Sequence, residues 1–314
     1  MPRITWDDLP GHVRTRVEDV LGSPVIRHTS SPHGFSPGTA DHVVCASGRE
    51  AFVKAVHPDL NAHSPELHRQ ELRVMRALPP GLPVPRLLGG FDDDAGWVVL
   101  ILEFVPGHHP SLPWTAETFS PVLDATLALS AGLTPSPIPS LDAASARMRP
   151  MFQGYVRCKS APPDDLDPWT LEHLEPFHQR AQRGLAAVDG ETLTHLDLRA
   201  DNILLREADG SPVFIDWPWA VRGAPWLDAT LLTATFAARP AADHEETDAV
   251  IRRIAAHAGV ATEPLVDVLV GFCAFGVWES RQPDKPGLPT LRAFQRTWAD
   301  ALTQWLQNTS LATW

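Results

Sequence analysis

The sequence contains few cysteines and no long hydrophobic segment. Its three cysteines, Cys45, Cys158 and Cys273, are far apart and lack paired metal-ligand spacing, which argues against a disulfide framework or a zinc ribbon. The longest apolar run, residues 265–278, is too short to span a bilayer and contains Asp267, so we predict a buried helix there. The first residues lack the apolar core of a signal peptide. Together these absences predict a cytoplasmic protein without a membrane partner.

Positive charge is also scarce, because 26 Lys and Arg residues stand against 38 Asp and Glu residues, which gives a formal net charge of −12. Such a chain would repel the phosphates of a nucleic acid, so no nucleic-acid partner is expected. The acidity is compatible with a cationic small molecule. The chain has no Walker-type glycine-rich motif, and a P-loop enzyme is therefore not supported. Nothing in the sequence fixes the oligomeric state.

The order of the predicted elements indicates an α+β fold in its first third. Strand-like segments at residues 24–29, 39–46 and 50–56 precede a helix that begins near Ser64, where serine can cap the helix and the next residue is proline. An apolar strand follows at residues 97–105. Several strands around one helix predict a small β-rich lobe.

The rest of the chain is predicted to be mainly helical. Residues 134–168 are rich in proline and are expected to form loops with short helices, and a long helix is expected over residues 168–187. In the last helix an apolar stripe is predicted to face the core: Leu291, Phe294, Trp298, Leu302 and Trp305. We therefore predict an N-terminal lobe over residues 1–105 and a larger C-terminal lobe over residues 106–314.

Lys54 is unusual because lysine occurs only three times in the chain and this one lies inside an apolar strand. The apolar face of the following helix is formed by Leu67, Val74, Met75 and Leu78. At about 100° per residue, Glu71 falls in the middle of that face. A buried carboxylate needs a cation, and Lys54 is the nearest candidate in the sequence. We predict that Lys54 and Glu71 form a pair; the alternative is a solvent-facing strand position for Lys54.

The segment THLDLRADNILL, residues 194–205, places several polar residues between apolar ones. Phosphoryl transfer needs a carboxylate that orients the attacking hydroxyl and accepts its proton, and Asp197 can take this role. It also needs oxygen ligands for Mg²⁺, which can come from Asn202 and from Asp216 at the end of the apolar strand VFID. A metallohydrolase, in which His and Asp bind a pair of metals, is the main alternative.

These motifs resemble the aminoglycoside phosphotransferase and choline kinase-like family. The resemblance rests on the spacing of His195, Asp197 and Asn202, on Asp216 between Ile and Trp, and on the position of Asp228. It covers about residues 20 to 235 and is supported by the order of Lys54 and Glu71 ahead of these motifs. It implies a bilobal protein-kinase-like fold, with a nucleotide-binding N-terminal lobe and a catalytic and acceptor-binding C-terminal lobe.

The resemblance also implies roles for the polar residues of the C-terminal motifs. Asp197 would be the catalytic base, and His195 would brace its loop. Asn202 and Asp216 would bind Mg²⁺. Asp228 would be structural and would tie the loop after Asp216 to the C-terminal lobe.

The residues that the resemblance implies for binding ATP or GTP are Lys54, Glu71, Glu103, Val105, Ser36 and Gly38. Lys54, positioned by Glu71, would hold the phosphates, and backbone groups near Glu103 and Val105 would bind the adenine edge. Ser36 and Gly38 belong to the segment expected to cover the nucleotide, residues 33–38. This segment departs from the usual glycine-rich pattern and has two prolines nearby.

The spacing of the motifs favours a small-molecule kinase over a protein kinase. Only eleven residues separate Asp216 from Asp228, too few for a long phosphorylatable activation segment. About ninety residues lie between the expected hinge and His195, room for an insertion that covers an acceptor. The implied acceptor is a hydroxyl of an aminoglycoside-type antibiotic, with Glu279 and Asp284 as candidate contacts. Choline-like, amino-alcohol or sugar acceptors are alternatives, as is a kinase-like binding module without turnover.

Overall fold

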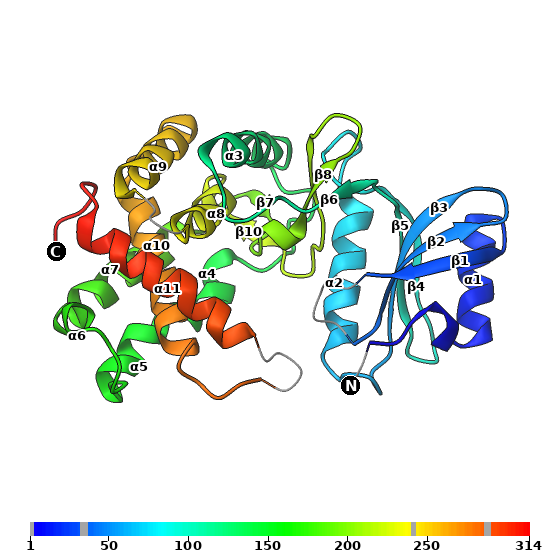
Figure 1. Ribbon diagram of the computed structural model, residues 1–314, viewed down its shortest axis with the longest axis horizontal. Helices are drawn as coiled ribbons and strands as arrows, with labels where there is room; N and C mark the ends of the chain where they lie inside the picture. Colours follow the sequence, from blue (N-terminus) through cyan, green and yellow to red (C-terminus); the bar gives the residue numbers. More distant parts are fainter. Residues whose placement is uncertain (1–2, 32–36, 240–242, 286–289) are drawn as a thin grey trace. The chain divides into compact units, whose positions relative to one another are not determined.

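A five-stranded antiparallel sheet forms the centre of the first of two units into which the chain divides (Figure 1). The structure is a computed structural model that describes residues 3–31, 37–239, 243–285 and 290–314. The first unit comprises the chain up to Pro110 together with Ala200–Ala220, and the second comprises Ser111–Arg199 and Val221–Trp314. The strands are β1 (Val25–Ser30), β2 (Thr39–Cys45), β3 (Glu50–Val56), β4 (Leu87–Asp92) and β5 (Val98–Glu103), in the order β1-β2-β3-β5-β4.

The two faces of this sheet pack against different helices. One face forms a core with η1 (Trp6–Asp8) and α1 (Gly11–Leu21), and its buried side chains include Trp6, Val13, Val17, Val43, Val53 and Ile101. Because successive side chains of a strand point to opposite faces, the neighbour of Val53, Lys54, lies on the other face. That face contacts α2 (Ser64–Ala77) through β3 and β5. Strand alternation therefore directs Lys54 toward α2.

Residues 200–220 belong to the first unit although they follow 89 residues of the second. They contain η3 (Ala200–Asn202), β8 (Ile203–Arg206) and β9 (Pro212–Phe214), and β8 lies between β9 and β6 (Gly107–His108) in a small sheet. The backbone N–H of Phe214 also donates to the carbonyl of Pro83 at 2.8 Å. These bonds place Asn202 and Asp216 in the same unit as Lys54.

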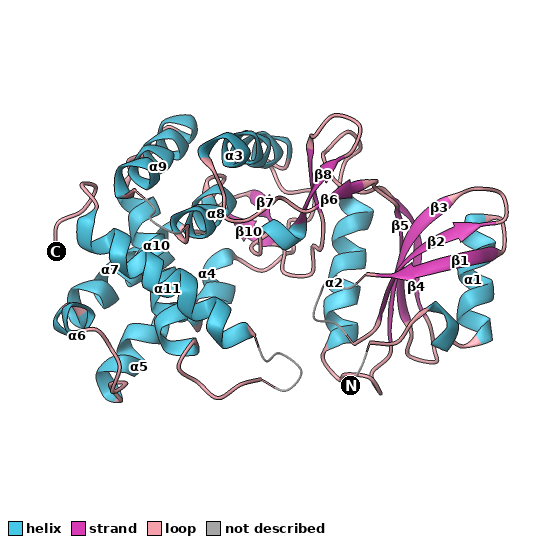
Figure 2. Ribbon diagram, in the orientation of Figure 1, coloured by secondary structure: helices cyan, strands magenta, loops and turns pink. Residues whose placement is uncertain are grey.

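The second unit is mainly helical (Figure 2). Its helices are α3 (Ala116–Gly132), α4 (Ala144–Met148), η2 (Met151–Gln153), α5 (Gly154–Ser160), α6 (Pro168–Glu172), α7 (Leu174–Ala187), α8 (Leu227–Ala237), α9 (His244–Ala258), α10 (Glu263–Glu279) and α11 (Leu291–Asn308). Two short antiparallel strands, β7 (Thr192–Thr194) and β10 (Val221–Gly223), complete it. A β-rich first unit and a mainly helical second unit confirm the predicted α+β class.

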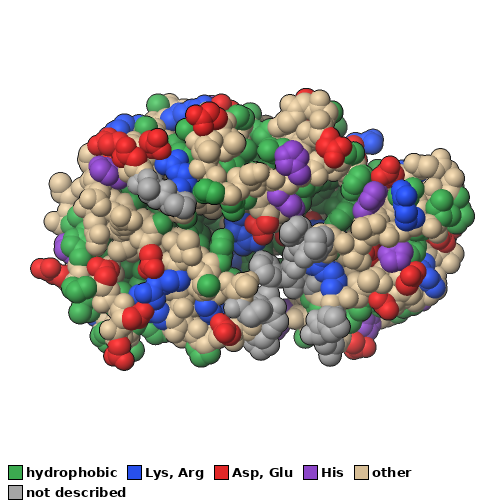
Figure 3. Space-filling view, in the orientation of Figure 1, with side chains coloured by type: hydrophobic (Ala, Val, Ile, Leu, Met, Phe, Trp, Pro, Cys, Tyr) green, Lys and Arg blue, Asp and Glu red, His purple; other side chains and the backbone are tan. Residues whose placement is uncertain are grey.

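The apolar run predicted to be a buried helix is α10, which packs against α7. Its one carboxylate within this packing, Asp267, is only 4% exposed and accepts hydrogen bonds from Arg180 at 2.5 Å and Arg183 at 2.9 Å. Two arginines thus compensate the buried charge. Across the part of the chain that the structure describes, no helix has the length and apolar character needed to cross a bilayer. On the face shown in Figure 3, acidic, basic and histidine side chains are interspersed.

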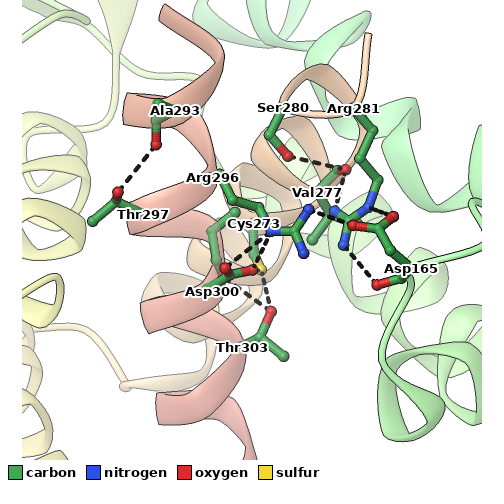
Figure 4. A network of polar contacts seen from close by, with 11 residues as sticks. Asp165, Cys273, Val277, Ser280, Arg281, Ala293, Arg296, Thr297, Asp300 and Thr303 are labelled. Carbon is green, nitrogen blue, oxygen red and sulfur yellow. Dashed lines mark hydrogen bonds and ion pairs between the residues drawn. The ribbon is translucent and has the colours of Figure 1, made fainter. Parts of the chain in front are cut away.

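An ion network joins the loop before α6 to the turn after α10 and to α11 (Figure 4). The carboxylate of Asp165 accepts a hydrogen bond from Arg281 at 2.7 Å and another from Arg296 at 2.6 Å. Arg296 also donates to Asp300, one turn further along α11, at 2.9 Å. One carboxylate therefore connects two loop segments and α11 within the second unit.

The long helix predicted over residues 168–187 is interrupted, because α6 ends and α7 begins on either side of His173. Pro176 explains the break. Proline lacks a backbone N–H, and in a continuous helix its ring would clash with the carbonyl of Glu172, four residues earlier. Asp167 caps the first piece by accepting the N–H groups of Trp169 and Thr170.

Candidate active site

A cluster of three ionisable side chains lies on the α2 face of the first sheet. Lys54 Nζ is 2.7 Å from Glu71 Oε1 and 2.9 Å from Glu71 Oε2, so the pair predicted from the sequence is present. Lys54 Nζ is also 2.5 Å from Asp216 Oδ1. Asp216 follows β9 and is 162 residues away in the sequence. One ammonium group is therefore shared by two carboxylates.

Burial and mutual attraction set the protonation of this cluster. Burial lowers the pKa of Lys54, but the Asp216 and Glu71 carboxylates outweigh it, and the pKa of Lys54 is raised above its ordinary value. Burial raises the pKa of Glu71, which is 2% exposed, while Lys54 opposes this by stabilising the carboxylate. Lys54 therefore stays cationic at neutral pH, and it can pair with a further anion.

Asn202 and Asp216 lie at the ends of neighbouring strands. β8 begins directly after Asn202 and pairs with β9, and the N–H of Ile215 donates to the Asn202 carbonyl at 3.0 Å. The backbone of Asp216 has φ 68°, a left-handed conformation that non-glycine residues seldom adopt and that recurs at functional sites. Carboxylate and amide oxygens are the donors that Mg²⁺ prefers, so this pair fits that ion. Within the described ranges no group of three or more His, Cys, Asp or Glu side chains gathers as a metal cage.

The second unit contains the loop with His195 and Asp197. β7 leads into His195, whose ring is fully buried and whose Nδ1 accepts the N–H of Asp197 at 3.3 Å. Leu196 between them has φ 68°, which is again left-handed. The Asp197 carboxylate lies 3.2 Å from Nη1 of Arg199. The hydrogen bond to His195 and the ion pair with Arg199 therefore give Asp197 a defined position.

Asp228, at the start of α8, binds the backbone of the same loop. Its carboxylate accepts the backbone N–H of His195 at 2.7 Å and that of Leu196 at 2.9 Å. Burial raises the pKa of Asp228 to about 6, and the two N–H groups oppose that increase. The role predicted for Asp228 was structural, but the predicted partner, the loop after Asp216, was wrong. The sequence around Asp228 contains no pattern that identifies its partners, because the two N–H groups that it binds lie about thirty residues earlier in the chain.

Of the residues predicted to contact the nucleotide base or to belong to the covering segment, the structure describes Glu103, Val105 and Gly38. Glu103 ends β5, donates its N–H to the Arg86 carbonyl at 2.8 Å and pairs with the Arg86 guanidinium at 3.1 Å. Val105 is buried, and among the described residues no group is hydrogen-bonded to its N–H. At Gly38 an added Cβ would lie 2.3 Å from the Ala55 carbonyl oxygen, so no other residue fits this close approach. Ser36 lies outside the described residues.

The two candidate acceptor contacts differ in their surroundings. Glu279, at the end of α10, accepts a hydrogen bond from Arg292 at 2.8 Å, and Arg157 lies 3.9 Å away. Asp284, in the segment after α10, is exposed. The carboxylate of Glu279 is thus already compensated by arginine, and acceptor binding by either residue stays a prediction.

Two members of the predicted core stripe of α11 lie outside the core, and one of them is Leu291, which is only half-buried. Trp298, Leu302 and Trp305 are in the core, but Phe294 is 45% exposed. Its ring lies 5.7 Å from the Arg199 guanidinium carbon, in cation–π range. Phe294 therefore packs against a residue of the Asp197 loop rather than against the core. Sequence reasoning missed this contact because Phe294 continues the apolar period of the helix.

Comparisons with known proteins concern the family and the fold of the chain. The model of the phosphotransferase enzyme family known as APH matches residues 35–267. Among curated proteins no sequence relative matches the chain. Aminoglycoside phosphotransferase from Alicyclobacillus acidocaldarius is similar in structure, with a TM-score of 0.56, 15% identity and coverage of 95% of this chain and 96% of that one.

Two further solved structures are similar to this chain. A thermostable mutant of aminoglycoside phosphotransferase APH(4)-Ia, in a ternary complex with ADP and hygromycin B, gives a TM-score of 0.59 at 15% identity and covers 95% of this chain and 99% of that one. Choline kinase LicA from Streptococcus pneumoniae gives 0.54 at 13% identity, with 93% and 98% covered. At such low identity these likenesses establish the fold alone, which is protein-kinase-like as predicted. On the family match, which extends over most of its length, the chain belongs to the phosphotransferase enzyme family.

Proposed function

We propose that the protein is a small-molecule kinase that transfers the γ-phosphoryl group of ATP or GTP to a hydroxyl of a small acceptor in a Mg²⁺-dependent reaction. The observation that carries the proposal is the cluster in which Lys54 is bonded to both Glu71 and Asp216. A buried lysine fixed between a helix carboxylate and a strand-end carboxylate can pair with the phosphates of a nucleotide. The neighbour solved with ADP and hygromycin B and the family match support a nucleotide substrate.

In the proposed reaction Asp197 acts as the general base. Its carboxylate accepts the proton of the acceptor hydroxyl while the hydroxyl oxygen forms a bond to the γ-phosphorus. The bond between the γ-phosphorus and the bridging oxygen breaks, and the nucleoside diphosphate leaves with that electron pair. His195 and Asp228 would keep Asp197 in position through the backbone bonds of its loop.

The charges of the nucleotide would be held by the first unit. Lys54 would bind phosphate oxygens, and Glu71 would keep Lys54 in place. Asn202 and Asp216 would hold Mg²⁺, which neutralises phosphate charge when bound. The N–H of Val105 would donate a hydrogen bond to the edge of the purine base, and Gly38 would let the chain pass close to β3 near the nucleotide. We also propose that residues 1–105 form the nucleotide lobe and residues 106–314 the catalytic and acceptor lobe, whose segment 200–220, with Asn202 and Asp216, belongs to the first unit and acts on the nucleotide.

The acceptor that the family resemblance favours is an aminoglycoside-type antibiotic, and the acidic net charge of the chain is compatible with it. A second candidate is a metabolite kinase acting on a choline-like, amino-alcohol or sugar acceptor. The pairing of Glu279 with Arg292 favours this second candidate, because a carboxylate already bound by arginine offers less to an amine.

Turnover by wild type and by Asp197→Ala tests the proposal. Nucleoside diphosphate release would be followed with Mg·ATP or Mg·GTP and a panel of aminoglycosides, amino alcohols and sugars. We expect turnover with at least one acceptor, and a loss of about 10²- to 10⁴-fold in Asp197→Ala with nucleotide binding retained. Asp201→Ala, an exposed acid four residues further on, is the matched control. Activity above about a tenth of wild type in Asp197→Ala would remove Asp197 from the role of base.

A further inference from the structure

An exposed aromatic ring on α11 contacts the arginine that pairs with the proposed general base. Nη1 of Arg199 lies 3.2 Å from Oδ1 of Asp197, and its guanidinium carbon lies 5.7 Å from the centroid of the Phe294 ring. The side chains of Asp197 and Arg199 are 27% and 24% exposed, and Phe294 is 45% exposed. All three residues belong to the second unit. A molecule whose hydroxyl reaches Asp197 can therefore also contact the guanidinium and the ring.

Further aromatic side chains follow Phe294 where α11 packs against α10. Trp298 comes four residues after Phe294, and residues at this spacing are neighbours on a helix surface. Its ring stacks on Phe272 of α10 with the centroids 4.4 Å apart, and Phe275 lies 6.2 Å away. Trp298 is buried, whereas Phe272 and Phe275 are only half-buried. A run of aromatic rings therefore extends from Phe294 to α10.

The carboxylates of these two helices, beyond the first turn of α10, are all paired with arginine. Each accepts a hydrogen bond from a guanidinium, in the pairs Asp267–Arg180, Glu279–Arg292 and Asp300–Arg296. A carboxylate already bound by arginine offers less to an amine of a ligand. The two helices therefore present aromatic rings to an acceptor, together with carboxylates whose charge is already compensated.

We propose that Phe294 and Arg199 select the acceptor, and that the acceptor is an uncharged alcohol with a ring, such as a sugar or a cyclic polyol. Its ring would pack against Phe294, and Arg199 would disfavour an amine near the reacting hydroxyl, because two positive charges repel each other. This inference rests on the proposed function, because it needs an acceptor hydroxyl at Asp197. The competing explanation is that Phe294 only keeps Arg199 in place, so that its loss would affect every acceptor equally.

Two pairs of acceptors test the inference in the full-length protein with Mg·ATP or Mg·GTP. Glucose and glucosamine differ by an amine, and inositol and sorbitol are uncharged polyols with a closed ring and an open chain. We expect kcat/KM to be about tenfold higher for glucose than for glucosamine, and about tenfold higher for inositol than for sorbitol. A preference for glucosamine over glucose, or for sorbitol over inositol, would overturn the inference.

Phe294→Ala separates acceptor packing from a structural role of the ring. We expect the KM for inositol to rise about tenfold, while the KM for sorbitol, the KM for the nucleotide and kcat change little. Phe294→Tyr keeps the ring and should behave as wild type does. Leu171→Ala, which removes an exposed apolar side chain from α6, is the matched control and should change none of these constants. Equal losses for inositol and sorbitol would assign Phe294 the structural role.

Arg199→Gln tests the part of the guanidinium. The ratio of kcat/KM between glucose and glucosamine cancels any loss of activity that both share, so it can be measured even if Asp197 is less well positioned. We expect this ratio to fall toward one in Arg199→Gln and to be retained in Arg199→Lys, which keeps the charge. An unchanged ratio in Arg199→Gln would remove Arg199 from acceptor selection.

The acceptors of the wild-type protein distinguish failure of this inference from failure of the proposed function. If wild type phosphorylates aminoglycosides, amino alcohols or open-chain alcohols but no uncharged alcohol with a ring, the inference alone fails. If it phosphorylates no acceptor, the proposed function fails with it.

Discussion

Two ion networks, one in each unit, differ in which charge is shared and in how far they are buried. In the first unit one cation, Lys54, is shared by two carboxylates, and the Glu71 side chain is 2% exposed. In the second unit one carboxylate, Asp165, is shared by Arg281 and Arg296, and its side chain is 54% exposed (Figure 4). Water can replace a lost partner in the second network but not around Glu71. The loss of stability when one charged residue is removed is therefore determined by the burial of its partners, rather than by the number of ion pairs.

The largest effect is expected for Lys54→Met, which breaks the buried network. Glu71 would be left without a cation in an apolar surrounding, so we expect unfolding to become easier by about 3–5 kcal/mol and nucleotide binding to be lost. Denaturant unfolding and calorimetric titration would measure both. Adding Glu71→Gln to Lys54→Met should recover stability without recovering nucleotide affinity. A Lys54→Met protein as stable as wild type would show that this network carries no buried charge.

Glu71→Gln alone tests whether Glu71 positions Lys54. It keeps the shape of the side chain but removes the charge that positions Lys54, so we expect weaker nucleotide binding in a folded protein. Loss of folding without a change in nucleotide affinity would instead assign Glu71 a purely structural role.

An intermediate effect is expected at Asp228, which is buried and held by N–H groups rather than by a cation. Its folded-state pKa, about 6, lies above the ordinary value of 3.8, so the folded state binds the proton more tightly than the unfolded state. The stability that this proton contributes is present below about pH 4 and is lost as the pH rises through about 6, in total about 3 kcal/mol.

Asp228→Asn removes this titration, at the cost of one accepted N–H bond at every pH. The thermal midpoint of wild type should therefore fall relative to that of Asp228→Asn between about pH 4 and pH 7. A wild-type midpoint that rises relative to that of Asp228→Asn over this range would mean that Asp228 is stabilised as a carboxylate, contrary to the burial effect.

The smallest effect is expected for Asp165→Asn in the exposed network. Its pKa is lowered by the hydrogen bonds from Arg296 and Arg281, so its stabilisation is present above the ordinary pKa and is lost as the pH falls below it. Because the side chain is more than half exposed, we expect a loss below about 1 kcal/mol at neutral pH, smaller still at high salt, and unchanged nucleotide binding. Destabilisation as large as that of Lys54→Met would contradict the comparison.

Local patterns in the sequence predicted much of the first unit. Strand alternation and the helical period placed Lys54 and Glu71 on facing surfaces, and the structure joins them. The contact of Lys54 with Asp216 could not be derived in the same way, because 162 residues separate them and only the path of the chain brings β9 back to the first unit. The periodicity of a segment predicts which side chains share one face of a helix or strand. Contacts between segments far apart in the sequence depend on the topology of the fold.

The errors arose where local pattern and tertiary packing disagree. Phe294 continues an apolar period, yet it lies at the edge of the stripe and contacts Arg199 instead of the core. Pro176 divides a helix whose apolar period runs through it. The roles of Asp197, Asn202 and the hinge residues stay predictions, because their geometry is compatible with phosphoryl transfer without testing it.

The most direct test of the central claim is the thermal midpoint of wild type and of Asp216→Ala with ATP and GTP, each with and without Mg²⁺. A nucleotide that binds only the folded state raises the midpoint, and we expect an increase in wild type that depends on Mg²⁺. Asp216→Ala should lose the part of the increase that requires Mg²⁺. A wild-type midpoint that neither nucleotide shifts, with or without Mg²⁺, would contradict the claim that this protein binds a nucleotide for phosphoryl transfer.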